Sequence, residues 1–242
     1  MENETETFSV SRLTEKDSSI IEDVVVREFP LTVVLNNQEL VTLLCSPTNL
    51  NYLAVGFLLS EGLLQSKDEI KKTIVDERRS IVRVETKEAT EPDRDVLFKR
   101  FITSSCGRGA SLYSAADVQG QLKVESQMEI SIYEVFELVT EFQHRSQIFT
   151  ATGGVHSAAL CDTKSILVFS EDIGRHNAID KVIGECLLND IATTDRLIIT
   201  SGRISSEILL KVAKRNIPII ISISAPTNLG VKLAADLGMT LI

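Results

Sequence analysis

The sequence lacks several features that would place it in a common class of protein. It has 25 Lys and Arg against 34 Asp and Glu, a net charge of −9, so it is too acidic for a general nucleic-acid binder. It has no uncharged apolar run of about 18 residues, which argues against a membrane span. The acidic, polar N-terminus has neither the basic flank nor the apolar run of a signal peptide. We therefore expect a cytoplasmic protein, in which thiols stay reduced.

Cysteine is scarce, and the four cysteines form no Cys-x-x-Cys pair. This spacing excludes a zinc ribbon and a thioredoxin-like couple. Three cysteines follow or lie within apolar runs and are predicted to be small core residues: Cys45, Cys161 and Cys186.

Cys106 differs, because its neighbours are serine, glycine and arginine, which bury little and bend easily. Arg108 and nearby backbone N–H groups would favour its thiolate. We predict that Cys106 is the reactive centre and carries sulfur as a persulfide. A turn that merely contains a cysteine is the alternative.

The overall composition is that of a soluble globular protein, since 43% of the 242 residues are apolar and 24% are charged. Residues 1–127 read as a smaller β-rich domain that includes the Cys106 loop. Pro47 ends its third strand, and a helix follows over residues 52–59. The charged stretch 66–100 suggests a solvated hairpin or meander edge. The predicted strands cover residues 23–29, 31–35 and 40–44, with a turn at Asn36-Asn37.

Residues 128–242 read as an α/β domain in the order α-β-β-α-β-α-β-α-β. The predicted helices cover residues 132–146, 177–188, 205–215 and 228–237. The predicted strands cover residues 155–161, 165–169, 197–200, 217–222 and 239–242. Continuous apolar strands indicate a parallel sheet covered by helices on both faces, which makes a three-layer α/β/α fold.

The least ordinary sequence follows the predicted strands, over residues 170–177, 201–207 and 224–227. Ligands of open α/β sheets lie beyond the carboxyl ends of the strands, at helix N-termini. Two Gly-Arg pairs at equivalent positions in these loops would suit a phosphate. Glycine lets the backbone approach the ligand closely, and arginine can donate two parallel hydrogen bonds to it. Simple caps and turns are the alternative. The residues predicted to line this pocket are Gly153, Gly154, His156, Arg175, His176, Asn177, Ser201, Gly202, Arg203 and Ser224.

Six blocks in one order carry a resemblance to a known family. They cover residues 53–62, 104–107, 152–158, 171–181, 200–203 and 223–227. Through them, nearly the whole chain resembles the formate dehydrogenase accessory protein family, FdhD/NarQ.

The resemblance implies a sulfurtransferase that takes sulfur from a cysteine desulfurase and delivers it to the molybdenum cofactor of formate dehydrogenase. Cys106 would be the cysteine that carries the persulfide. The cofactor is a bis(molybdopterin guanine dinucleotide), so a guanine nucleotide is a plausible pocket ligand. The resemblance also implies a cytidine-deaminase-like second domain and a homodimer.

Two departures from the family pattern stand out. Many members have a second cysteine three residues after the first, whereas this sequence has Gly109, so Cys106 would work alone. Members usually continue beyond the position of Ile242 with a short glycine- and arginine-containing tail.

Two other functions are open to comparison. A zinc deaminase needs a His or Cys two residues before a catalytic Glu, together with a Pro-Cys-x-x-Cys pair. His156 is not followed by such a Glu, and the sequence has no Cys-x-x-Cys pair. We therefore expect no zinc. A non-catalytic chaperone that binds the cofactor remains as the alternative function.

Overall fold

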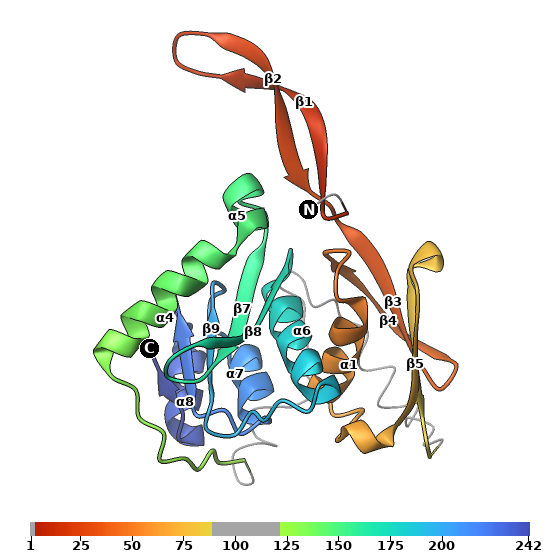
Figure 1. Cartoon of the computed structure of the whole chain (residues 1–242), viewed down its shortest axis with the longest axis vertical. Coiled ribbons are helices and arrows are strands. Elements are labelled where there is room, and N and C mark those ends of the chain that lie inside the picture. The colour runs from red at the N-terminus through yellow and green to blue at the C-terminus, as the bar shows by residue number, and fades with distance from the viewer. Residues whose placement is uncertain (1–2, 89–121) are drawn as a thin grey trace.

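A computed structural model of the chain describes residues 3–88 and 122–242 (Figure 1). The chain begins with an antiparallel hairpin of two nine-residue strands, β1 (Thr5–Leu13) and β2 (Ser18–Val26). This hairpin extends away from the rest of the molecule, as Figure 1 shows at its top. The sequence prediction missed β1 and placed the end of the next strand at residue 29, three residues after β2 ends. Instead the chain turns after Val26, where the Arg27 amide donates to the Glu4 carbonyl at 2.8 Å.

A four-stranded sheet follows, with the strand order β4-β3-β6-β5. Its strands are β3 (Phe29–Leu35), β4 (Gln38–Cys45), β5 (Ile70–Asp76) and β6 (Ile81–Thr86). Asn36 and Asn37 form the predicted turn with φ of 47° and 66°. The prediction of a solvated edge for residues 66–100 is wrong for β6, which lies between β3 and β5. Val82 and Val84 alternate inward and are 0% exposed, while the charged residues of β6 point the other way.

Helix α1 (Leu50–Ser60) packs against helix α6 (Arg175–Leu188). Two glycines make this crossing close. A Cβ added at Gly56 would lie 1.8 Å from the Asp180 carbonyl oxygen, and one at Gly184 would lie 2.0 Å from the Tyr52 carbonyl oxygen. The two backbones therefore touch, and no larger residue fits at either position.

The second sheet has five strands in the order β11-β10-β9-β7-β8. They are β7 (His156–Cys161), β8 (Ile166–Asp172), β9 (Leu197–Thr200), β10 (Ile219–Ser222) and β11 (Thr240–Leu241). Strands β9, β10 and β11 are parallel, whereas β7 is antiparallel to both of its neighbours. The predicted all-parallel sheet is therefore a mixed one, because the tight turn at residues 162–165 joins β7 and β8 as a hairpin.

Helices cover both faces of this sheet, so the predicted three-layer α/β/α arrangement is confirmed. Helix α4 (Ile132–Arg145) covers one face, and its Leu138 and Phe142 pack on residues such as Ile199 and Ile221. Helix α6, helix α7 (Ser206–Ala213) and helix α8 (Asn228–Leu237) cover the other. A short helix that the sequence did not predict, α5 (Gln147–Thr152), follows α4.

One apolar core joins the two sheets. It runs from Leu31 and Val82 of the first sheet, through Leu53 of α1 and Ile183 of α6, to Leu209 of α7. The predicted division into residues 1–127 and 128–242 stays a prediction. Among the helices of the described residues, none is long and apolar enough to cross a membrane.

Candidate functional site

The loops with the predicted pocket residues meet at one edge of the five-stranded sheet. Strands β8, β9 and β10 run in the same direction, so their carboxyl ends lie together with the start of β7. The Ser201 amide donates to the Ser157 carbonyl at 3.0 Å, and the Ser224 hydroxyl donates to the Ser201 carbonyl at 2.9 Å. A Cβ added at Gly202 would lie 2.6 Å from Cβ of Arg175. Because Gly202 lacks one, Arg175 can pack directly on the loop after β9.

His156 lies at the start of β7, with Nδ1 3.3 Å from the Ser201 hydroxyl oxygen. That oxygen accepts a hydrogen bond from the Ser157 amide at 2.9 Å, so its own proton is free to point at Nδ1. Burial and then the positive charge of Arg175 lower the pKa of His156. Both effects favour the neutral imidazole form of His156.

Arg175 is the first residue of α6, and its side chain is half-buried. Its Nε is buried and has no hydrogen-bond partner among the described residues. Helix α6 also begins without a side-chain cap, since Gly174 is its N-cap residue. The Asp172 carboxylate accepts a hydrogen bond from the Gly174 amide at 2.9 Å, so the helix start already holds one negative group beside the positive charge of Arg175. An arginine at the N-terminus of a helix is an arrangement that suits an anion.

His176 is 5% exposed and lies beneath this site. Burial, followed by the charges of Lys211 and Arg175, lowers the pKa of His176 to about 3. Its Nε2 lies 3.7 Å from a carboxylate oxygen of Glu207, which is too long for a hydrogen bond. A neutral His176 contributes shape and no charge to the site.

Asn177 is 1% exposed, so it faces the interior and not the surface of the loops. Its amide nitrogen donates to the Leu44 carbonyl at 2.8 Å and to Asp172 at 2.8 Å. These bonds tie the start of α6 to the end of β4. Its predicted contact with the cofactor stays a prediction, and the structure shows a role in positioning the loop.

The sequence reasoning missed a buried network beneath the loop after β8. Asp172 and Lys181 form an ion pair at 2.8 Å, and both side chains are 0% exposed. The Lys181 ammonium also donates to the carbonyls of Glu171 at 3.0 Å and Ser46 at 3.3 Å, while the Ser46 amide donates to Asp172 at 3.0 Å. The signal was available, because Asn177 and Lys181 lie one helical turn apart on a face that is otherwise apolar.

A second buried pair joins three helices. Lys211 of α7 lies 2.5 Å from Asp180 of α6, which also accepts a hydrogen bond from Ser60 of α1 at 2.6 Å. Lys214 donates to the Ser60 carbonyl at 2.6 Å. These residues give the pocket loops a rigid base.

The remaining predicted residues lie around the rim. Arg203 is exposed on the loop after β9, and Ser224 is half-buried after β10. Gly153 has a φ of 65° and ends α5, where its amide donates to the Phe149 carbonyl at 2.7 Å. A Cβ at Gly154 would lie 2.6 Å from Val26, so this glycine contacts the base of the hairpin.

The three cysteines that the structure describes are buried, as predicted. Burial is the main cause that raises the pKa of each of these thiols to about 12. None of them is a thiolate at neutral pH. They are Cys45, Cys161 and Cys186, all buried and free. Cys106 lies outside the described residues.

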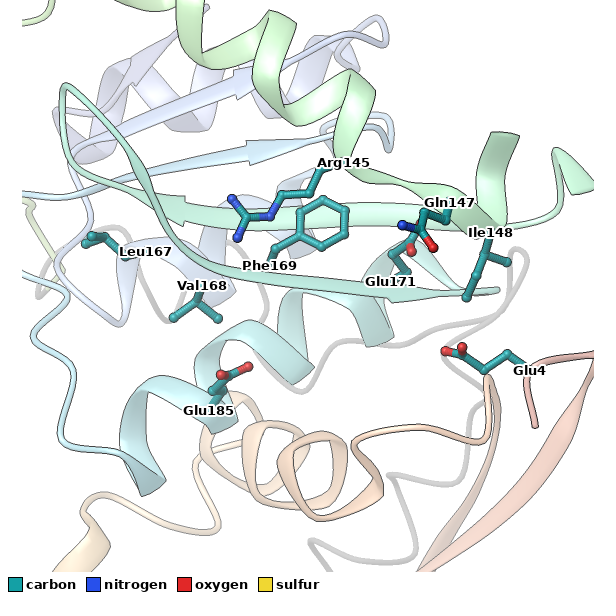
Figure 2. A pocket seen from close by; sticks show the side chains of 9 residues that line it. All are labelled: Glu4, Arg145, Gln147, Ile148, Leu167, Val168, Phe169, Glu171 and Glu185. Carbon is teal, nitrogen blue, oxygen red and sulfur yellow. The ribbon is translucent and has the colours of Figure 1, made fainter. Parts of the chain in front are cut away.

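A separate pocket of about 520 Å³ lies along β8 and contains none of the predicted pocket residues (Figure 2). The Arg145 guanidinium lies 5.8 Å from the centre of the Phe169 ring on its wall. Burial raises the pKa of Glu171 and of Glu185 there. Its lining residues are Glu4, Arg145, Gln147, Ile148, Leu167, Val168, Phe169, Glu171 and Glu185. Among residues 3–88 and 122–242, no group of three or more His, Cys, Asp or Glu could hold a metal ion.

The structure is that of an α/β protein in which the loops after β8 and β9 and the start of β7 bring Arg175, Ser201 and His156 to one sheet edge. Residues 26–242 match the FdhD/NarQ family. The chain belongs to this family.

Individual relatives support the same family assignment. This chain is 46% identical over 233 residues to the sulfur carrier protein FdhD of Bacillus subtilis, and the match covers 96% of this chain and 89% of that one. The Staphylococcus aureus (strain MRSA252) protein of the same name is 41% identical over 220 residues, covering 91% and 83%. A crystal structure from Desulfotalea psychrophila, named for a formate dehydrogenase accessory protein, has a TM-score of 0.82 at 25% identity, covering 98% and 91%.

Proposed function

We propose that this protein is a sulfurtransferase that carries sulfur as a persulfide on Cys106. The donor is a cysteine desulfurase, and the acceptor is the molybdenum bis(molybdopterin guanine dinucleotide) cofactor needed by formate dehydrogenase. The work takes place in the cytoplasm, where thiols stay reduced. The names of the relatives support the sulfur-carrying role.

The burial of the other cysteines is the observation that carries this proposal. A persulfide carrier needs a thiolate that can reach a partner protein. Three of the four cysteines are buried, with thiol pKa values of about 12. Cys106 is the cysteine that remains for the chemistry.

The transfer itself needs no external oxidant at the loading step. The Cys106 thiolate attacks the outer sulfur of the donor's persulfide, the donor's S–S bond breaks, and the donor cysteine leaves as a thiolate. Cys106 then holds the outer sulfur through a new S–S bond. At delivery the acceptor provides the electron pair that attacks this sulfur, and the Cys106 thiolate returns.

The loops at the sheet edge supply the cofactor site in this proposal. Phosphates of a guanine dinucleotide would face Arg175, Arg203 and the N-terminus of α6, which offer charge and N–H donors. His156, held by the Ser201 hydroxyl at its Nδ1, would donate a neutral hydrogen bond beside them through Nε2. The unpartnered Nε of Arg175 supports this assignment, because a buried donor needs an acceptor.

The sulfur step is tested by mass spectrometry after incubation with a cysteine desulfurase and cysteine. We expect one added sulfur atom on Cys106 and none on the buried cysteines. In cells, Cys106→Ala abolishes formate dehydrogenase activity, whereas Cys186→Ala retains it. Full activation by the Cys106→Ala protein would reject sulfur transfer and favour the non-catalytic chaperone.

The nucleotide site is tested separately by calorimetric titration with GDP. Replacing Arg175 by alanine removes charged hydrogen bonds and weakens binding roughly tenfold or more. Arg145→Ala, in the pocket along β8, serves as the matched control and leaves GDP binding unchanged. Equal affinity in the wild type and the Arg175→Ala variant would reject this site.

A further inference from the structure

The pocket along β8 follows an open edge of the five-stranded sheet. Strand β8 stands last in the order β11-β10-β9-β7-β8, so no strand of the described residues pairs with its outer side. The pocket of about 520 Å³ runs along this outer side, between α6 on one flank and α4 and α5 on the other (Figure 2). We call it the β8 groove. Free backbone groups of an edge strand pair readily with another strand, so the groove is a place where a strand can be added.

The register of the sheet shows which backbone groups of β8 point into the groove. Ser157 of β7 directs its amide and its carbonyl at the loop after β9. Alternate residues of a strand point opposite ways, so the next residue of β7 faces β8 and pairs there with Ser170. Phe169 and Glu171, on either side of Ser170, therefore turn their N–H and C=O groups outward. The Glu171 carbonyl agrees with this direction, since it accepts from Lys181 of α6 at 3.0 Å.

The β8 groove is acidic. Its lining contains the carboxylates of Glu4, Glu171 and Glu185 and one cation, Arg145. The Arg145 guanidinium is already engaged, because it donates to Glu141 of its own helix at 2.9 Å. Burial is the main cause that raises the pKa of Glu171 and of Glu185, and the charge of Glu4 adds to it at Glu171. A cation bound in the groove would offset both effects.

Two of these carboxylates lie on opposite flanks of the strand. Glu171 accepts a hydrogen bond from Ser146 on the α4 flank, whereas Glu185 belongs to α6. Figure 2 shows Glu185 toward the Val168 end of the groove and Glu171 toward the other end. Residues three positions apart on an extended strand point to opposite faces and are about 10 Å apart. A strand with basic residues at positions i and i+3 would therefore place one beside each carboxylate.

Other occupants satisfy only part of the groove. Strand β8 of a second copy contains Glu171 and Asp172 and no lysine or arginine, so two such edges would repel each other. A free polyamine would neutralise the carboxylates, but it would leave the amide and carbonyl of Phe169 without a strand partner. An extended basic segment of another protein meets both requirements.

We propose that the β8 groove binds an extended segment of a partner protein, which adds a strand to β8 and carries two basic residues three positions apart. Backbone pairing with Phe169 and the Glu171 amide supplies attraction that is independent of side chains. Glu171 and Glu185 then select lysine or arginine at the two positions. The groove contains neither Cys106 nor the loop with Arg175, so this proposal stands or falls separately from the proposed sulfur transfer.

Fluorescence anisotropy with a labelled peptide, Thr-Lys-Val-Thr-Lys-Val-Thr, tests the charges. We expect Glu185→Gln to weaken binding to the full chain roughly tenfold, because a charge-assisted hydrogen bond is lost. Glu171→Gln has a similar effect. Glu137→Gln, on the exposed side of α4, is the matched control and leaves the affinity unchanged. A wild type that does not bind the peptide, or groove variants that bind it as tightly as the wild type does, overturns the proposal.

N-methylated peptides test strand addition on the unchanged protein. Only alternate residues of an added strand point their N–H groups at β8. One peptide is methylated at its odd-numbered residues and another at its even-numbered residues. We expect one of them to bind at least about tenfold more weakly than the parent, and the other to change less than about threefold. Parent-like affinity in both would mean that charge alone holds the peptide, as it would hold a polyamine, and this outcome or loss in both overturns strand addition.

Amide hydrogen exchange followed by NMR locates the peptide on the protein. The Phe169 amide gains a hydrogen-bond partner in the proposed complex, so its exchange slows by about tenfold or more at saturation with the parent peptide. The Ser170 amide is the control within the same strand, because it faces β7 already and its rate stays unchanged. A Phe169 amide that exchanges equally fast with and without the peptide overturns the proposal.

Discussion

The buried histidine beneath the site makes the stability of this protein depend on pH in a predictable direction. The pKa of His176 is lowered from 6.5 to about 3 in the folded protein, and burial is the main cause. The unfolded chain therefore binds a proton at this residue before the folded protein does. The stabilisation is complete above pH 6.5 and is lost progressively as the pH falls toward 3.

The magnitude follows from the pKa difference. Between pH 6.5 and pH 5 the unfolded state gains about 1.4 kcal/mol per pH unit from this proton, or about 2 kcal/mol in all. The variant His176→Gln has no group to protonate and keeps that stability at pH 5. The charged groups that face His176 are Arg175, Lys211 and Glu207, together with His156. All of them remain in the variant, so their own titration largely cancels in the comparison.

Urea unfolding at pH 7 and pH 5 measures the effect. We expect the wild type to lose about 2 kcal/mol more than His176→Gln over this interval. His144→Gln, at the exposed end of α4, is the control and should follow the wild type. The reasoning is refuted if His176→Gln loses as much free energy of unfolding as the wild type does.

Three further predictions concern packing and thiol reactivity. Gly56→Ala places a Cβ 1.8 Å from the Asp180 carbonyl oxygen, so we expect urea unfolding to show a free energy of unfolding lower by about 3 kcal/mol. A loss under about 1 kcal/mol would contradict the close crossing of α1 and α6. Lys211→Met leaves the Asp180 carboxylate buried without its cation and destabilises by about 3–5 kcal/mol, and thermal unfolding should show that adding Asp180→Leu restores part of the loss. Iodoacetamide should label Cys106 in the native protein, and mass spectrometry should find the buried thiols alkylated only in urea. Those thiols are Cys45, Cys161 and Cys186.

The parts of the fold with local signals were predictable from the sequence. Strand β9 and helix α8 have the residue bounds predicted for them. For α8 the reason is chemical, since the Thr227 hydroxyl accepts from the Gly230 amide at 3.1 Å and Gly238 ends the helix with a φ of 73°. The β1–β2 hairpin was not predictable in the same way. Neither of its faces is buried, and the only apolar residues that alternate with polar ones in β1 are Phe8 and Val10, which is a weak strand signal.

The meeting of the loops was predictable, and their support was not. Strands that run in one direction bring their following loops to one edge, which is how Arg175 and Ser201 come together. Among the partners of Asp172, Ser46 was out of reach for sequence reasoning, because it lies 126 positions earlier in the chain. A pair so distant in sequence leaves no periodic signal. The mixed direction of the sheet was missed for a related reason, since a buried antiparallel strand such as β7 is as apolar as a parallel one.

The bond between Ser46 and Asp172 has a consequence for how the protein is made. A ribosome adds about 5–20 residues each second, so the 126 positions between them take roughly 6–25 s to synthesise. During that interval the end of β4 and the glycine face of α1 have been released, but α6, which covers them, does not yet exist. The first sheet therefore waits with apolar surface uncovered, and chaperones have time to act on this chain before Gly184 emerges.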